Sequence, residues 1–158
     1  MDENVSCIKK KSENKSCSSH EECWTNYCGK GVCELNPQPL SSNILTPPEI
    51  MSLLDLIGFR TKTFSLLWRG SNKGFGARTF HSHCDGKGAT LTVVKTTTGY
   101  ILGGYASLAW HSAESHFVDT DSFQYFLTNA QNKPLKLNNI DPEFGPYGNS
   151  QYGPTWGN

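Results

Sequence analysis

The sequence has no excess charge of either sign and no long apolar run. Among its 158 residues, lysine plus arginine number 14, and aspartate plus glutamate also number 14. Because binding to nucleic acid or to anionic lipid depends on positive charge, this balance argues against both kinds of partner. No stretch approaches the roughly 20 consecutive apolar residues of a membrane-spanning helix. We therefore expect neither a nucleic-acid partner nor a membrane span.

Signals for a cofactor and for export are also missing. The glycine pairs in GKG (86–88) and GGY (103–105) are too short for a phosphate-binding loop, because the spacings G-x-x-x-x-G-K-[ST] and G-x-G-x-x-G do not occur. We therefore expect no bound cofactor.

Residues 1–17 lack the apolar core of a secretory signal peptide. Since this conflicts with the abundance of cysteine described next, we hypothesise that the natural N-terminus lies upstream of Met1.

Cysteine is concentrated at the front of the chain, where five of the six cysteines fall within the first 33 residues. This segment has few apolar side chains besides Trp24 and Tyr27, so it needs covalent or metal cross-links to hold a fold. Disulfides are the favoured interpretation, although sequence alone does not give their pairing. The candidates are Cys7, Cys17, Cys23, Cys28 and Cys33.

Two alternatives to disulfides remain open, a zinc site and a reduced tail without cross-links. A zinc site would use the last four of these cysteines with His20 nearby, but their gaps are at or beyond the usual spacing of structural zinc ligands. The stretch CSSHEECWTNYCGKGVC is similar to the small disulfide-rich modules of Dickkopf or EB type in secreted animal proteins. That similarity covers only residues 17–33.

The chain divides into a cysteine-rich segment (1–34), a linker (35–45) and a globular domain (46–158). The linker contains two prolines among Ser and Asn residues.

The domain begins with a predicted helix, because Thr46 and Glu49 form a capping box and Pro47 suits the first helical position. Gly58 is the predicted end of this helix. We interpret it as a core-packing helix rather than one that docks on a partner, from the helical spacing of Ile50, Leu53, Leu54 and Ile57.

The rest of the domain is dominated by predicted strands. Alternating β-branched residues in 90–95 and the apolar run 100–105 indicate an antiparallel hairpin, in which Gly103 and Gly104 mark a bulge or a close backbone approach. We predict further strands at 64–68 and 122–128, a continuation of the hairpin through 106–110, a turn at 85–88 and a short helix at 74–84 capped by Ser71 or Asn72. Such a mixture predicts an α+β fold, with an antiparallel, two-layered sheet and short helices against it.

The chain contains, in this order, the motifs LLWRGS, GF, TFHSHCDGKGATLTVVKT, GYILGGYAS and YGPTWG. In order and spacing they resemble the TLDc domain, from about Ser42 to the end. The resemblance implies a β-sandwich-like module flanked by helices, as in eukaryotic oxidation-resistance proteins, and a cytoplasmic location. Several members of this family bind and regulate the vacuolar proton-pumping ATPase, and the family is not established as an enzyme class.

The resemblance departs from the family at the C-terminal end. In TLDc domains the segment corresponding to YGPTWG leads into a final strand and a closing hairpin, which are missing here. We therefore expect a truncated sandwich with an exposed sheet edge and an uncovered core. The aromatic residues of the tail 144–158, which lack the basic charge of a nucleic-acid platform, are expected to be left without their packing partners.

The densest group of reactive side chains outside the front end is His81, His83, Cys84 and Asp85. A thiol nucleophile needs a base about 3 Å away, but adjacent residues on a helix point in different directions. We interpret Cys84 as a buried apolar residue, with redox sensing, catalysis and metal binding as alternatives. His81 and Asp85 are spaced to pair on an exposed helical face.

The acidic and histidine side chains further along are interpreted as solvated. Asp119 and Asp121 lie in the polar sequence VDTDSF, which favours an exposed turn over a calcium or acid–base site. His111 and His116 lie just before it and are expected to face water.

These observations predict a non-catalytic protein-interaction module with no catalytic, cofactor or metal residues. By resemblance, its partners would be subunits of the vacuolar ATPase, and its role protection from oxidative stress. The alternative is a secreted or luminal recognition protein, stapled by disulfides, that binds through its cysteine-rich segment. A third hypothesis, a peroxidase-like enzyme, would need an exposed Cys84 thiol of low pKa. The predicted fold-defining residues are Trp68, Arg69, Gly70, Gly74, Phe75, Phe80, Cys84, Asp85, Gly103 and Gly104.

Overall fold

The computed structural model of the chain describes residues 16, 18, 28–29, 31–33, 40–59 and 62–156. The chain forms two compact units, Met1–Leu40 and Ser41–Asn158. In the first unit, β1 (Cys28–Gly29) pairs antiparallel with β2 (Val32–Cys33). The cysteine side chains of the predicted disulfides and of the alternative zinc site lie outside the part of the chain that the structure describes.

The second unit begins with α1 (Pro47–Ile57), which forms as predicted. The Glu49 carboxylate accepts hydrogen bonds from the Thr46 backbone N (2.6 Å) and Oγ1 (2.7 Å), and Gly58 ends the helix with a left-handed φ of 77°. The core-packing interpretation is also confirmed, because the predicted apolar side chains are buried: Ile50, Leu53, Leu54 and Ile57.

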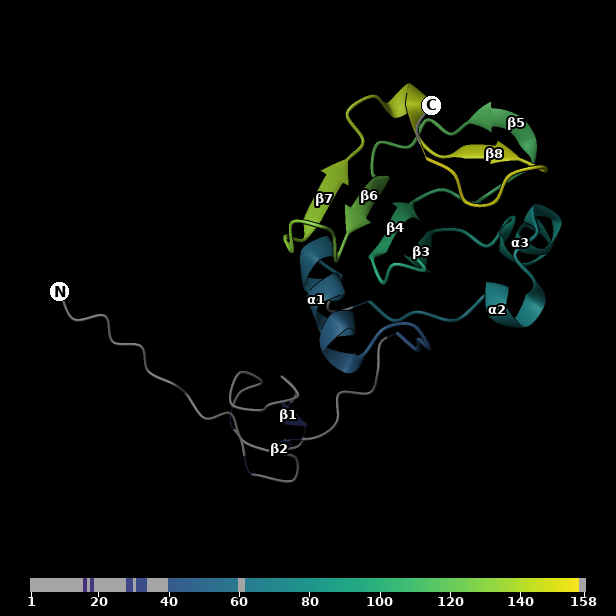
Figure 1. Ribbon diagram of the computed structural model, residues 1–158. Coiled ribbons are helices and arrows are strands. Elements are labelled where there is room, and N and C mark those ends of the chain that lie inside the picture. The colour runs from purple at the N-terminus through teal and green to yellow at the C-terminus, as the bar shows by residue number, and fades with distance from the viewer. Residues whose placement is uncertain are drawn as a thin grey trace. The chain divides into compact units, whose positions relative to one another are not determined.

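Two antiparallel sheets follow (Figure 1). The main sheet has the order β3 (Thr90–Lys95), β4 (Ile101–Ala106), β6 (Phe123–Phe126) and β7 (Leu135–Asn138), and β5 (Ala113–His116) pairs with β8 (Tyr147–Asn149). β3 and β4 form the predicted hairpin, and β6 lies within the predicted strand 122–128. The α+β class with antiparallel sheets is confirmed.

Gly103 and Gly104 mark a close approach and not a bulge, because the pairing of β3 with β4 is continuous through both. A Cβ atom at Gly103 would overlap the Thr92 carbonyl oxygen and lie 2.6 Å from the Tyr125 hydroxyl oxygen. A Cβ atom at Gly104 would lie 2.6 Å from the ring of Trp156. Only glycine leaves room for these neighbours at the centre of the strand.

One face of the main sheet packs on the α1 side. The strand register places Tyr105, Phe123 and Tyr125 on this face, and Tyr125 is fully buried. The ring of Phe59, just after α1, lies 4.9 Å from that of Tyr105 and 6.0 Å from that of Phe123. Because α1 also contacts β7, the helix covers this face.

A second core surrounds α3 (Ala77–Cys84). It combines Phe80 and Cys84 with side chains that follow in the chain, and Trp68 packs on it with its ring 5.5 Å from that of Phe80. The buried members of this cluster are Phe80, Cys84, Ala106, Trp110 and Phe117. The Trp110 indole N donates to Thr90 Oγ1 at 2.7 Å, which ties this core to β3.

Three local predictions are wrong. Residues 64–68 form no strand, and Leu66 is 59% exposed, because this segment is a connection that packs only Leu67 and Trp68 onto the second core. The predicted helix at 74–84 is shorter, since α2 (Gly70–Lys73) ends at Gly74 and α3 is capped by Gly76. β4 does not continue through 106–110.

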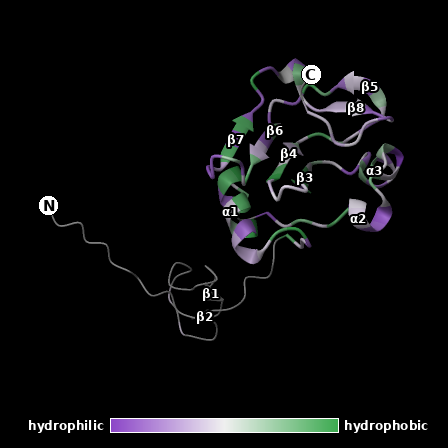
Figure 2. Ribbon diagram, viewed as in Figure 1, coloured by the Kyte–Doolittle hydropathy of each residue, from purple (hydrophilic) through white to green (hydrophobic). Residues whose placement is uncertain are grey.

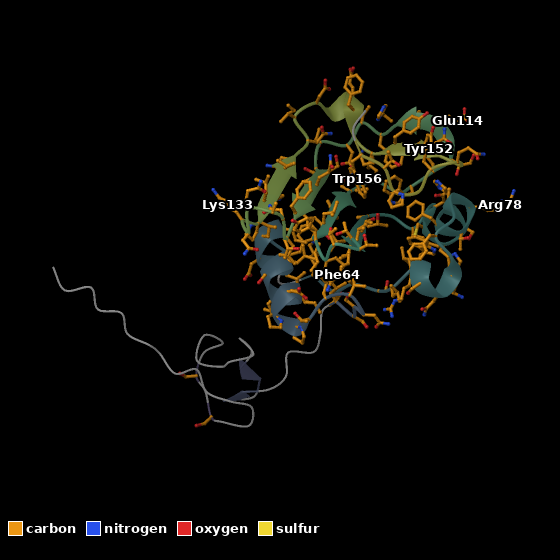
Figure 3. The ribbon with its side chains drawn as sticks, viewed as in Figure 1. Phe64, Arg78, Glu114, Lys133, Tyr152 and Trp156 are labelled. Atoms are coloured by element: carbon orange, nitrogen blue, oxygen red, sulfur yellow. The ribbon has the colours of Figure 1, made fainter. Side chains whose placement is uncertain are left out.

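The last described segment, residues 146–156, is called the strap here. It folds back on itself, with the Tyr147 N donating to the Thr155 carbonyl at 3.0 Å. The Trp156 ring then meets the Trp110 ring edge to face at 5.4 Å, and its indole N donates to the Tyr105 carbonyl at 3.3 Å (Figure 3). The expectation that the tail aromatics lack packing partners is therefore wrong. The strap returns Trp156 to the second core, and the rings of Phe144, Tyr147 and Tyr152 also contact other rings.

Candidate interaction surface

The predicted fold-defining residues around α2 have unequal surroundings. The half-buried Arg69 precedes the helix, and Gly74 ends it with a φ of 91°. A Cβ atom at Gly70 would lie 2.5 Å from the Phe75 ring, so that ring lies over the start of α2. Phe75 is 81% exposed and is a surface aromatic, not a core residue. The fold-defining role of the whole set stays a prediction.

Cys84 is buried in the second core, as predicted. Burial, together with the negative charge of Asp85, raises the pKa of its thiol to about 11. His83 Nδ1 donates to the Thr79 carbonyl at 2.8 Å, and within the described part of the chain neither nitrogen of His83 is hydrogen-bonded to the Cys84 sulfur. A buried thiol of high pKa is a poor nucleophile.

His81 and Asp85 form the pair that their spacing predicts, with Nδ1 and Oδ1 2.7 Å apart. The predicted exposed face is wrong, since His81 is only 8% exposed. Its Nε2 lies 2.8 Å from the Asn149 carbonyl and 2.9 Å from the Tyr152 carbonyl, so the strap covers the ring. Asp85 Oδ2 accepts a hydrogen bond from the Ser112 hydroxyl at 3.0 Å. Because the Ser112 hydroxyl donates to the Asp85 carboxylate and not to the His81 imidazole, Ser112 and His81 do not form a nucleophile and its base.

The interpretation of Asp119 as part of a solvated turn is wrong. Asp119 is 2% exposed, and its carboxylate accepts hydrogen bonds from the Ser107 N (2.8 Å), the Ser107 hydroxyl (2.5 Å), the Leu108 N (3.3 Å) and the Asp121 N (3.2 Å). These bonds turn the chain away from the sheet after Ala106 and explain why β4 ends there. Asp121 is exposed, as expected.

The two histidines expected to face water are half-buried instead. The His111 ring packs at 4.2 Å from that of Phe117. His116 lies between the rings of Phe144 (5.6 Å) and Tyr147 (4.9 Å). Both belong to the packing around β5 and β8, which local polarity along the sequence does not reveal.

The face of the main sheet opposite α1 carries an apolar row that no described helix or strand covers. Cα pairing aligns Val94, Leu102, Phe126 and Leu135 across all four strands, so their side chains share one face. Val94 is 42% exposed and Leu135 is 45% exposed. The next row toward the strap adds Thr92, Gln124 and Leu137. These seven residues are called the open face, and none of them is charged. Figure 2 shows the hydropathy of the strands that carry these rows, with hydrophobic stretches in β4 and β7.

The open face continues into a groove beside the strap. The groove has a volume of about 310 Å³, and Pro154, Thr155 and Trp156 form its strap side. At this end the face is covered, because Trp156 lies over Gly104 and Ala106 belongs to the second core. Among the described strands β3 pairs only with β4 and β7 only with β6, so both edges of the main sheet are unpaired there. In the sequence, this surface is indicated by the alternation of polar and apolar side chains within 90–95 and 135–138.

Residues 62–156 and the other described positions contain no group of three or more His, Cys, Asp or Glu side chains placed to hold a metal ion. Within the same described part of the chain, no helix combines the length and apolar character that crossing a membrane requires.

Comparison with protein families matches the model of the TLDc domain to residues 39–158. The match includes α1, both sheets and the strap. Comparison with curated proteins gives no match.

Proposed function

We propose that this chain, which belongs to the TLDc domain family, is a protein-interaction module whose open face contacts its partner. The observation that carries the proposal is the uncharged apolar row across the main sheet, with two of its side chains more than two fifths exposed. Contiguous exposed apolar surface is typical of protein interaction sites. A sheet face beside an unpaired strand edge suits a protein partner because it offers both apolar surface and free backbone groups.

The partner we propose is the vacuolar proton-pumping ATPase, and the role is protection from oxidative stress in the cytoplasm. Support comes from the family resemblance, since several TLDc proteins bind and regulate this enzyme. The neutral net charge agrees with a contact based on shape and apolar area rather than on electrostatic attraction.

We propose further that the chain is not an enzyme. The buried Cys84 thiol with its raised pKa and the Ser112 hydroxyl, which donates to a carboxylate and not to an imidazole, both support this. Neither group has the exposed, base-activated arrangement that a nucleophile needs.

Binding of the full chain to purified vacuolar ATPase holoenzyme tests the function and the surface together. Val94→Glu places a charge in the open face, and Val118→Glu is the matched control, since Val118 is 69% exposed and lies outside the main sheet. We expect Val94→Glu to weaken binding about tenfold or more, and Val118→Glu to leave it unchanged. Thermal unfolding of both variants checks that the fold is intact.

Two outcomes would contradict the proposal in different ways. If the wild-type chain does not bind the holoenzyme, the partner is wrong. If Val94→Glu and Val118→Glu bind as well as the wild type, the partner stands but the open face is not the contact surface.

The alternative is a secreted or luminal protein that binds through its cysteine-rich segment. Cys28 and Cys33 are opposite positions in the β1–β2 hairpin, which brings two cysteines of the segment together in the backbone. Counting free thiols without reductant separates the two functions. Two or more native disulfides favour the secreted protein, and five or six free thiols exclude it.

A further inference from the structure

We propose that His81 is a proton-controlled clasp, whose imidazolium form holds the part of the strap after β8 on α3 and whose neutral form releases that part. The strap is the segment 146–156, and the clasp is the set of hydrogen bonds from His81 to Asp85, Asn149 and Tyr152. This inference does not depend on the identity of the protein partner.

Every polar partner of the His81 ring is an acceptor. Nδ1 faces the Asp85 carboxylate, and Nε2 faces the main-chain carbonyls of Asn149 and Tyr152. A carbonyl oxygen cannot donate, and an ionised carboxylate also only accepts. Both ring nitrogens must therefore carry hydrogen, so the geometry fits the protonated ring. In the neutral ring, one nitrogen would turn a lone pair toward an acceptor inside a buried site.

The two carbonyls belong to the turn 149–152 in the middle of the strap. Its shape is fixed locally by the bond from the Tyr152 N to the Asn149 carbonyl (3.0 Å) and by the bond from the Gln151 N to the Asn149 side chain (2.8 Å). Nε2 thus bonds to both ends of one compact turn. At its C-terminal end the strap is held by Trp156, whose ring contacts Trp110 and lies over Gly104. β8 (Tyr147–Asn149), near the start of the strap, is also paired with β5, so the clasp and the tryptophan hold the part of the strap that follows β8.

The groups around the ring favour the charged form. Burial by itself lowers the pKa of His81, but the hydrogen bonds to Asp85, Tyr152 and Asn149 and the charge of Asp85 outweigh it and raise the pKa above 6.5. Ser112 holds the second Asp85 oxygen, and the Tyr152 phenol lies toward the Tyr147 ring at 6.3 Å. Arg78 on α3 and Glu114 on β5 are exposed to solvent (Figure 3).

The direction of the pH effect follows from linkage. In the closed state the part of the strap after β8 is held by His81, and in the open state it is released. Because the pKa of His81 is higher in the closed state, its protonation stabilises that state fully below the ordinary pKa of 6.5. This stabilisation is lost as pH rises through the closed-state pKa. We expect strap opening to increase about tenfold per pH unit between those two values and to level off above the higher one.

Two measurements on the full chain by NMR test the clasp. The first is the titration of His81 from about pH 5 to about pH 9. The second is hydrogen exchange of the amides of Tyr147 and Tyr152, corrected for the intrinsic effect of pH. We expect His81 to titrate above 6.5, with the loss of amide protection following the same transition. Asp85→Asn should lower the pKa of His81 and shift the loss of protection to lower pH, whereas His83→Gln on the same helix should change neither.

A His81 that titrates at or below its ordinary value would overturn the proposal. So would strap amides whose corrected protection stays constant while His81 loses its proton. Because both readings come from the wild-type chain, they decide the matter even if Asp85→Asn does not fold.

Discussion

Asp119 is a charged side chain whose burial is compensated by donors from two loops. Its carboxylate accepts from Ser107 and Leu108 just after β4 and from Asp121 in its own loop, while its backbone carbonyl accepts from the Asn139 amide at 3.1 Å. Buried charge is costly unless it is hydrogen-bonded, and here four donors meet the two oxygens. Asp119 therefore joins three connections that are distant in sequence.

Replacing Asp119 by alanine should be strongly destabilising. The change removes the buried carboxylate that accepts from the Ser107 N and hydroxyl, the Leu108 N and the Asp121 N, so we expect the free energy of unfolding to fall by about 3 kcal/mol. Urea denaturation measures this loss. Asp121→Ala, in the same loop but exposed, is the control and should change stability by less than about 0.5 kcal/mol. Equal losses in the two variants would contradict the role given to Asp119.

At the scale of elements, α1 and the β3–β4 hairpin were predictable because their signals are local. The capping box, the helical spacing and Gly58 lie within one segment, and the alternation of 90–95 needs no knowledge of distant residues. The segment 64–68 has strand-like composition, but no neighbouring strand is available to pair with it, so tertiary context overrides its propensity. β7 was missed because the alternation in LKLN extends over only four residues.

The candidate site was less predictable for the same reason. Val94 and Leu102 could be placed on one face from the hairpin, but the row needs the pairing of Leu102 with Phe126 and of Phe126 with Leu135. The burial of His81 likewise depends on carbonyls from the strap, far along the chain. Sequence spacing predicts a pair within a helix and does not reveal what covers it.

The centre of β4 should tolerate no side chain at Gly103. A methyl group there would overlap the Thr92 carbonyl, which belongs to the backbone of β3 and cannot rotate away. We therefore expect Gly103→Ala to lower the free energy of unfolding by about 2 kcal/mol or more. Gly153→Ala is the control, because a methyl group at that position would meet no atom within 4 Å beyond its chain neighbours, and its effect should stay within about 0.5 kcal/mol. Comparable denaturation midpoints for the two variants would show that β3 and β4 are not packed this closely.

For the whole molecule, two titrating contacts give stability opposite dependences on pH. Hydrogen bonds from the Thr46 backbone and hydroxyl lower the pKa of Glu49 below 4.5, so its contribution is present above that value and is lost as pH falls through the folded pKa. The contribution of His81, whose pKa is raised, is present below 6.5 and is lost at higher pH. Both contributions are complete only between these values.

We therefore expect these contacts to favour maximal stability of the chain between about pH 4.5 and about pH 6.5. Chemical denaturation at a series of pH values measures the profile. Glu49→Gln should flatten its acid side and His81→Gln its alkaline side, because each variant removes one titration. If Glu49→Gln keeps the wild-type slope on the acid side, the Glu49 contact does not control stability there. If His81→Gln keeps the wild-type slope on the alkaline side, the same holds for the His81 contact.

The indole of Trp156 fills the space that the missing side chain of Gly104 leaves. A side chain at position 104 would collide with the indole, and a smaller residue at position 156 would leave a void, although the two positions lie far apart in the chain. Descendants of this sequence should therefore inherit the two residues together. A lineage that gains a methyl group at position 104 should be one that has already exchanged its final tryptophan for something smaller.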